Sequence, residues 1–345
     1  MMIIQPEGES HLKKKPFFVS EQLSKLIDDF QIKFTKMMWP YAFFHLFFLT
    51  LGLFELTFFA FFFTFLSEHS LGAFALSLIF LTAFSYFILR LYYQTRKPEQ
   101  LKELKKKFAL KAKEILDYQE GNSECHAALA DAFCRLAQSL NGREHCFYKA
   151  PKLFSRLNTT VEKISYWAHW NDVYNMKEMA LNAAVEEYIK SVKCEATSLE
   201  AHTALANAYI LLTSLYINPQ GQEDEDEKRL APSSIHSTAI QQKFRVAAEK
   251  AIEEFKILRD YSPNDPWIHE QLAYSYCDLH MPSEAIAEYE QILLLNPGDT
   301  EMLYKLGVLY FQSGRTAQGL HVYEQLKSSH YKKAEMLISH YGAYS

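Results

Sequence analysis

Three histidines recur in one setting and are the first residues whose type and spacing could do chemistry. His126, His202 and His269 each stand three residues before a Leu-Ala pair and seven before an aromatic residue. Three imidazoles could share a metal ion or serve a catalytic centre. A shared Zn²⁺ would need them to lie within about 4–5 Å of one another, because each Zn–N bond is about 2.1 Å long. Whether they can meet depends on the elements that carry them.

Other chemical signatures are missing from the sequence. It contains no HExxH, GxSxG or P-loop motif and no GxGxxG beside a predicted strand. The acidic run at residues 223–227 lacks the glycine and the spacing of a calcium loop, and the five cysteines show no CxxC pair. The net charge of −5 argues against a nucleic-acid partner. We therefore expect free thiols and no catalytic residue, metal or cofactor.

Two long apolar runs dominate the N-terminal third of the chain. They cover residues 41–66 and 71–89, contain 15 of the 26 phenylalanines, and are separated by the four residues SEHS at 67–70. A helix needs about 20 apolar residues to cross a bilayer. Burial inside a soluble core is disfavoured because nothing else in the chain could cover so many phenylalanines. We predict a transmembrane helical hairpin over residues 38–93.

The charges that flank the hairpin predict its orientation. Six lysines precede the first apolar run, seven lysines and arginines lie between residues 90 and 107, and the SEHS turn has none. The positive-inside rule then places both termini in the cytoplasm. A bacterial inner membrane is the expected location. The layout also resembles that of inclusion membrane proteins secreted by intracellular bacteria, which makes a host-vacuole membrane the alternative.

Glu55 is an unusual residue because it falls in the middle of the first apolar run. A charged carboxylate is costly in lipid, so such residues are functional candidates. Glu55 could pair with a polar side chain of a neighbouring helix, including one of a second copy, so that the hairpin forms a homo-oligomer. Alternatively, Glu55 and His45 could act in a membrane transporter or a membrane enzyme complex.

A shorter amphipathic pattern precedes the hairpin. Apolar residues recur at spacings of three and four between Val19 and Met37, and Ser20 is a plausible N-cap. We expect a disordered tail over residues 1–16 and then a juxtamembrane helix, lying at the lipid headgroups, up to residue 37.

Residues 94–345 are predicted to be helical and repetitive. In the two regular copies Leu272 and Leu306 are 34 residues apart, and small and aromatic residues follow each of them at equal offsets. These flanking residues are Ala273, Tyr276, Ala285 and Tyr289 in one copy and Gly307, Tyr310, Gly319 and Tyr323 in the next. This pattern resembles the tetratricopeptide repeat (TPR), a helix–turn–helix of 34 residues.

Two earlier copies match less regularly. Leu205 and Leu129 begin first helices whose second helices carry Ala251 and Ala184. The resemblance thus implies an all-α solenoid of about four repeats, two with insertions over residues 141–171 and 217–239. The aromatic cluster YWAHW in the first insertion is expected to form a helix that packs under the array, with an exposed docking patch as the alternative. Residues 331–341 are expected to form a capping helix.

The repeat also gives the histidines a structural role. They occupy position 4 of the first helix, where the family usually has a bulky residue and where the fourth repeat has Leu303. Equivalent positions of neighbouring repeats are about 18–20 Å apart, twice the distance between packed helix axes. The three imidazoles therefore cannot converge, and we expect them to be half-buried between repeats.

The TPR resemblance implies a binding site on the inner face of the array, formed by first-helix side chains. The predicted partner-binding residues are Asp131, Arg135, Asn207, Trp267, Glu270, Tyr274, Tyr304 and Phe311. With one arginine, one asparagine and several acids, this face departs from the lysine and asparagine clamp with which some family members hold a carboxylate. It suits a basic or amphipathic peptide. The chain's own termini or insertions could cover the aromatic residues instead. The sequence thus predicts a non-enzymatic, membrane-anchored adaptor or scaffold.

Overall fold

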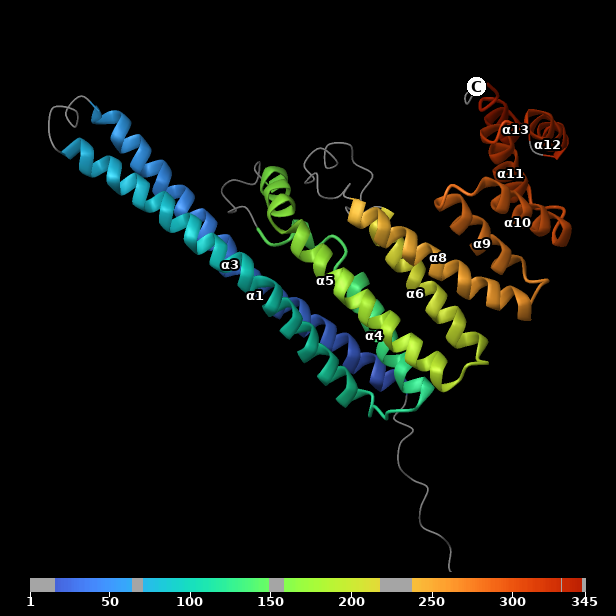
Figure 1. The fold of residues 1–345 in the computed structure, drawn as a ribbon, viewed down its shortest axis with the longest axis horizontal. Helices are drawn as coiled ribbons and strands as arrows, with labels where there is room; N and C mark the ends of the chain where they lie inside the picture. Colours follow the sequence, from blue (N-terminus) through green and yellow to red (C-terminus); the bar gives the residue numbers. More distant parts are fainter. Residues whose placement is uncertain (1–15, 64–70, 149–157, 218–237, 330, 343–345) are drawn as a thin grey trace, which may run out of the picture. The chain divides into compact units, whose positions relative to one another are not determined.

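The structure is a computed structural model, and it describes residues 16–63, 71–148, 158–217, 238–329 and 331–342. Within these ranges every regular element is a helix, which confirms the all-α prediction. The predicted N-terminal tail up to residue 15, the SEHS turn and the acidic run lie outside the described residues. The elements in chain order are α1 (Pro16–Phe61), α3 (Leu71–Ile115), α4 (Ser123–Ser139), η1 (Arg143–His145), α5 (Asn158–Cys194), α6 (Leu199–Ile217), α8 (Thr238–Tyr261), α9 (Pro266–Asp278), α10 (Pro282–Leu295), α11 (Thr300–Gln312), α12 (Thr316–Ser329) and α13 (Tyr331–Ile338) (Figure 1).

The chain forms two compact units. The first contains Met1–Glu120 and Asp131–Ala180, and the second contains Gly121–Ala130 and Leu181–Ser345. We call them the hairpin unit and the array unit and describe each by itself. The sequence-based boundaries at residues 38 and 94 stay predictions.

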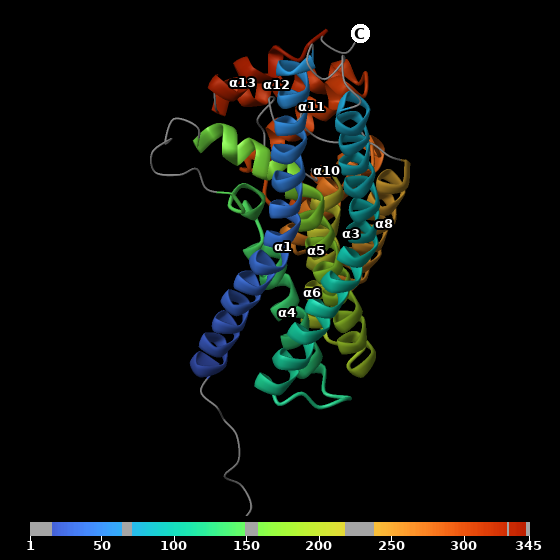
Figure 2. The same ribbon diagram turned by 90° about the vertical axis from the view of Figure 1, so that its left-hand side faces the viewer.

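Helices α1 and α3 lie side by side and form the long arms of the hairpin unit (Figure 2). Both are long and apolar enough to cross a membrane. Of the most apolar 18-residue stretch, only 6% is buried in α1 and none in α3. Each helix runs through an internal proline, Pro40 or Pro98, so the predicted juxtamembrane helix and first span are one helix. That helix begins at Pro16, a residue type favoured in the first turn, and not at Ser20.

The first part of α1 buries its apolar face inside the protein. The buried side chains on this face are Leu23, Leu26, Ile27, Phe30, Phe34 and Met38. The Phe30 ring packs edge-on against Phe108 of α3, with centroids 5.6 Å apart, and Phe34 packs against Phe147 at 5.8 Å. The apolar face of this segment therefore packs against the chain itself, and the prediction that it lies on lipid headgroups was wrong.

Helix pairs build the array unit and confirm the TPR-like solenoid. Helix α6 packs against α8, α9 against α10, and α11 against α12. The starts and ends of α11 and α12 all lie 34 residues after those of α9 and α10. An aspartate caps both first helices, since Asp265 accepts from the Trp267 amide and Asp299 from the Glu301 amide, each at 3.0 Å.

Small residues let these helices approach closely. Ala273 and Ala285 are fully buried in the third repeat, and glycines replace them in the fourth. A Cβ at Gly307 would lie 2.6 Å from a Leu337 methyl group, and one at Gly319 would lie 2.6 Å from the Phe311 ring. Leu337 belongs to α13, which packs on α11 and α12 as the predicted cap.

Two earlier helix pairs are interrupted as predicted. Helix α8 pairs with α6 although 20 residues, 218–237, lie between their ends. The insertion at 141–171 contains η1 and then the first turns of α5, which begins at Asn158. Much of that insertion is thus an extension of the second helix.

Candidate functional site

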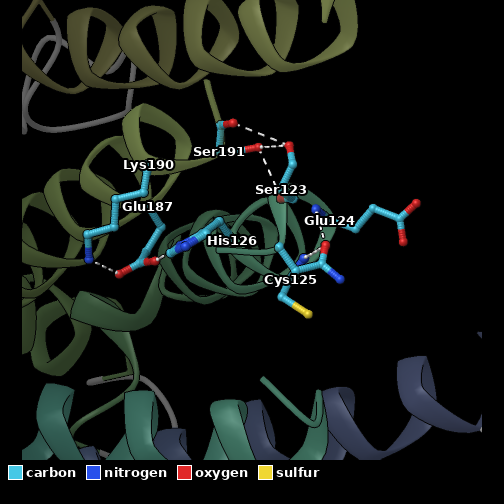
Figure 3. Close-up of polar contacts among 8 residues, drawn as sticks. Ser123, Glu124, Cys125, His126, Glu187, Lys190 and Ser191 are labelled. Carbon is cyan, nitrogen blue, oxygen red and sulfur yellow. Dashed lines mark hydrogen bonds and ion pairs between the residues drawn. The ribbon is translucent and has the colours of Figure 1, made fainter. Parts of the chain in front are cut away.

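The three recurrent histidines are buried, and each pairs with a glutamate of the second helix in its own repeat. The Nδ1-to-Oε2 distances are 2.7 Å for His126–Glu187, 2.6 Å for His202–Glu254 and 2.5 Å for His269–Glu288. At 4–7% exposure the imidazoles are more buried than the sequence suggested. Figure 3 shows the first pair, in which Lys190 also contacts Glu187 at 2.7 Å. The histidines therefore bridge helices and do not share a centre.

The second ring nitrogen fixes the protonation of two of these pairs. His202 Nε2 lies 3.0 Å from the carbonyl oxygen of Ala196, and His269 Nε2 lies 2.9 Å from that of Pro263. A carbonyl only accepts, so Nε2 carries a proton. A second proton must then lie between Nδ1 and the carboxylate, because two lone pairs would otherwise face each other. Each pair is thus a hydrogen-bonded clamp between its two helices.

The fourth repeat shows that histidine and glutamate are exchanged together. Its equivalent residues are Leu303 and Val322, which pack in one hydrophobic cluster. The sequence does contain a signal for these pairs, because a glutamate stands directly before the second-helix aromatic, as in Glu254-Phe255. The prediction used the aromatic residue of this dipeptide and left out the glutamate. The clamp therefore replaces an apolar contact at the same place in the repeat.

This clamp predicts that stability depends on pH. Burial lowers the pKa of His202, but hydrogen bonds to Glu254 and the Ala196 carbonyl outweigh it, so its pKa is raised above 6.5. A raised pKa contributes stability that is complete below pH 6.5 and is lost as pH rises through the folded-state pKa. We expect the unfolding midpoint of wild type to fall over that window relative to a His202→Leu/Glu254→Val variant. Circular dichroism melts in detergent measure it, and parallel pH curves would contradict the clamp.

The predicted inner face remains open on α6 and α9. Asn207 is exposed, and the Trp267 ring is 40% exposed while its edge packs on Phe255, with centroids 5.8 Å apart. Three of the array unit's predicted residues, Trp267, Glu270 and Tyr274, lie on α9, where helical spacing places 267, 270 and 274 on one face. Trp267 is therefore accessible to a ligand, whereas Glu270 and Tyr274 are half-buried.

The Tyr274 ring already binds a cation of the protein. Lys305 of α11 lies over the ring at 4.7 Å and donates to the Tyr274 hydroxyl at 2.5 Å, while that hydroxyl donates to Glu270. Burial and the Glu270 carboxylate raise the pKa of Tyr274. The hydroxyl therefore stays neutral at physiological pH, and the site is an aromatic face with a carboxylate beside it.

The C-terminal segment covers the predicted residues of the fourth repeat. Tyr304 reaches His340 at 3.5 Å, and Phe311 is 6% exposed with its ring 6.0 Å from that of Tyr341. Lys333 of α13 also pairs with Glu301 at 2.7 Å. In the fourth repeat, the predicted binding residues are therefore covered by the C-terminal segment, which was the alternative expectation.

The remaining predicted residues belong to the hairpin unit. Asp131 and Arg135 form an exposed ion pair of 2.8 Å, which is worth little in stability. Glu55 accepts a hydrogen bond of 2.8 Å from Thr82 of α3, and its Oε2 is buried without a partner among the described residues. His45 makes a separate contact of 3.2 Å with Tyr86. Glu55 and His45 are thus each linked to α3, not to each other.

A buried polar chain in the hairpin unit was not predicted. His169 of the YWAHW cluster lies 2.9 Å from the Tyr148 hydroxyl and 3.3 Å from Asp172, which pairs with Lys97 at 2.5 Å. Trp167 of the same cluster is exposed. Tyr166 and Trp170 of the cluster are buried within the hairpin unit, whereas the sequence led us to expect packing under the repeat array.

Comparisons with known proteins find only distant similarity. No family model and no curated protein matches this chain. A solved structure of TTC0263, a thermophilic TPR protein of Thermus thermophilus, is 16% identical, covers 61% of this chain and 98% of its own, with a TM-score of 0.31. YrrB, described as a TPR protein with an unusual peptide-binding site, is 15% identical to this chain. Its match covers 55% of this chain and 98% of YrrB, with a TM-score of 0.25. The chain is similar to TPR proteins at this distant level.

Proposed function

We propose that this protein is a membrane-anchored adaptor whose helical array binds a basic or amphipathic peptide segment of a partner protein. The observation that carries the proposal is the strip of Trp267, Glu270 and Tyr274 on α9, in which Trp267 is exposed and the other two residues are half-buried. An exposed tryptophan and a half-buried tyrosine beside a carboxylate are features expected of a peptide-binding face.

The Lys305 contact indicates the chemistry of the partner. Its ammonium lies over the Tyr274 ring, next to the Glu270 carboxylate, where a lysine or arginine of a ligand would also bind. A peptide cation would compete with Lys305 for this position. Trp267, 40% exposed, would take an apolar side chain of the same segment.

The hairpin supports the anchoring part of the proposal. Its apolar stretches have almost no cover from the described chain, and exposing such helices to water would be costly. A bilayer would cover them, with both termini in the cytoplasm. A second copy could cover part of the same surface, which keeps a homo-oligomer within the proposal.

Native cysteines allow a test of anchoring and orientation. Cys146 and Cys194 are exposed, and neither lies in the apolar part of the hairpin. In cells, alkaline carbonate should leave the protein in the membrane pellet. In sealed inside-out vesicles, a membrane-impermeant maleimide should label both thiols, and in right-side-out vesicles neither. Release by carbonate, or labelling from the outer side, would contradict the anchor or its orientation.

Photo-crosslinking tests the peptide-binding face. A benzoyl-phenylalanine at Trp267 in the full-length protein should crosslink to a lysine-rich amphipathic peptide. The same residue at Leu294 of α10, which is 74% exposed, provides the control. Equal yields at the two positions would contradict a specific face on α9.

A role for Glu55 in a transporter or membrane enzyme remains the alternative. A carboxylate at the centre of a span disfavours insertion by about 2.5–3.5 kcal/mol, whereas a cross-helix hydrogen bond such as Thr82–Glu55 returns only about 0.6–2 kcal/mol. Stability alone therefore does not account for Glu55.

We expect Glu55→Leu to insert at least as well as wild type and to leave peptide binding unchanged. The carbonate-resistant fraction and the peptide dissociation constant measure these two results. A variant that inserts normally but loses a proton-linked or transport activity would support the transporter alternative. Loss of peptide binding would contradict the separation of anchor and array.

A further inference from the structure

A groove lies beside the part of α1 that precedes its apolar stretch. It has a volume of about 710 Å³ and is lined by Asp28, Gln31, Ile32, Thr35, Lys36 and Trp39 of α1 and by Arg143 of η1. All of these residues belong to the hairpin unit. The groove combines two cations, hydrogen-bonding groups and an exposed indole, so it could hold a ligand with both a charged and an apolar part.

The protein holds one of the two cations in place. The Arg143 guanidinium donates through Nη2 to the side-chain oxygen of Gln31, and the Gln31 amide donates to the Ser139 carbonyl at 2.9 Å. The bond to Gln31 uses one of the five N–H donors of the Arg143 guanidinium. The remaining donors and the exposed Lys36 ammonium are available for the oxygen atoms of an anion.

Neither groove cation forms an ion pair with a described residue, unlike the nearby lysines of the same helix. Lys25 pairs with Glu21 at 2.7 Å and Lys33 pairs with Asp29 at 2.5 Å. Asp28 also lines the groove and lies three residues before Gln31, on the same face of the helix, so its carboxylate offsets one of the two positive charges. The lining as a whole therefore keeps a net positive charge, from Lys36 and Arg143 against Asp28.

An aromatic stripe continues from the groove along α1. The stripe consists of Trp39, Phe43 and Phe47, which recur at spacings of four residues and are 50–61% exposed. The rings of Phe43 and Phe47 are stacked, with their centroids 6.5 Å apart. Tryptophan is enriched where a helix leaves the bilayer. A ligand with its head at Lys36 and Arg143 would place an apolar tail along this stripe.

We propose that the groove binds the headgroup phosphate of an anionic phospholipid from the cytoplasmic leaflet. This inference rests on the proposed membrane anchor. Basic pockets at the cytoplasmic side of membrane-spanning helices suit anionic headgroups, and a guanidinium matches phosphate geometry. The bound lipid would hold η1 against α1 at the base of the hairpin.

Calorimetry on the full-length protein in neutral detergent tests the proposal. The probes are dioctanoyl phosphatidylglycerol, dioctanoyl phosphatidylcholine and inorganic phosphate. Each cation near a membrane surface contributes about 1 kcal/mol, or about fivefold. We expect the phosphatidylglycerol dissociation constant to rise about fivefold for Lys36→Gln and about 30-fold for Lys36→Gln/Arg143→Gln. The matched control Lys25→Gln/Lys33→Gln removes the same charge and should change it less than about twofold.

Three results would overturn the inference. They are an equal effect of the control, equal binding of phosphatidylcholine, and binding of inorganic phosphate as tight as that of the lipid. Lys36 is exposed, so Lys36→Gln should fold even if the double variant does not. Carbonate extraction separates this test from that of the anchor. An integral protein without selective lipid binding would refute the groove alone, and a protein absent from membranes would refute the anchor.

Discussion

Replacing His202 by leucine should lower the free energy of unfolding by about 3 kcal/mol. The substitution leaves the Glu254 carboxylate, 17% exposed, facing an apolar side chain without its partner. Breaking a buried ion pair by removing one member typically costs about 3–5 kcal/mol, and the partial exposure of Glu254 places the expected value at the lower end. Urea unfolding of the full-length protein in detergent, followed by circular dichroism, measures the loss.

The double variant His202→Leu/Glu254→Val should recover most of that stability. It installs the pair that the fourth repeat already uses, Leu303 and Val322, at the equivalent position. Replacing a buried pair by well-packed apolar residues is often neutral. If the double variant were as unstable as His202→Leu, the glutamate would not be the partner whose loss matters.

Replacing Gly319 by valine should lower the free energy of unfolding by about 3 kcal/mol. In an open helix, removing a glycine gains up to about 1 kcal/mol. Here a Cβ would lie 2.6–2.9 Å from three atoms of the Phe311 ring, which is itself buried against Tyr341. Overpacking of this kind costs about 1–3 kcal/mol, and the valine methyl groups add to it.

Gly298 provides the matched control for this second prediction. No atom lies within 4 Å of a Cβ built there, so Gly298→Ala should change stability by less than about 0.5 kcal/mol. The loss of unfolding free energy for Gly319→Ala should lie between the losses for Gly319→Val and Gly298→Ala. An increase in stability for Gly319→Ala would show that Phe311 moves aside and that the helix contact is not tight.

The turns between helices show how a repeat position constrains the backbone. His280 and Gly314 are 34 residues apart, and both have a positive φ, of 56° and 71°. Glycine adopts this conformation without steric cost, whereas histidine does not. The fourth repeat therefore has the less strained turn.

The helix pairs could be predicted because their signal is local. A small residue or an aromatic recurs where neighbouring helices touch, and the spacing of 34 between Leu272 and Leu306 is also the spacing between the observed helices of the two repeats. The pairing of α6 with α8 was predictable for the same reason, despite the interruption.

The partners of polar and amphipathic residues could not be predicted in this way. His126 and Glu187 are 61 positions apart, and only their shared place in the repeat connects them. The apolar face around Phe30 has the same pattern whether it meets lipid or Phe108. Cover of Phe311 by Tyr341 depends on where the chain turns after α12.

Peptide binding to the reconstituted protein tests the central claim most directly. The full-length protein is placed in vesicles of phosphatidylglycerol and phosphatidylcholine, and the dissociation constant of a lysine-rich amphipathic peptide is measured. Trp267→Ala/Tyr274→Ala should weaken binding about 30-fold, as expected if each of the two side chains contributes about 1 kcal/mol. Tyr331→Ala, which changes an exposed tyrosine of α13, should leave it unchanged. Equal affinity of all three proteins, or equal binding of a charge-reversed peptide, would contradict the account.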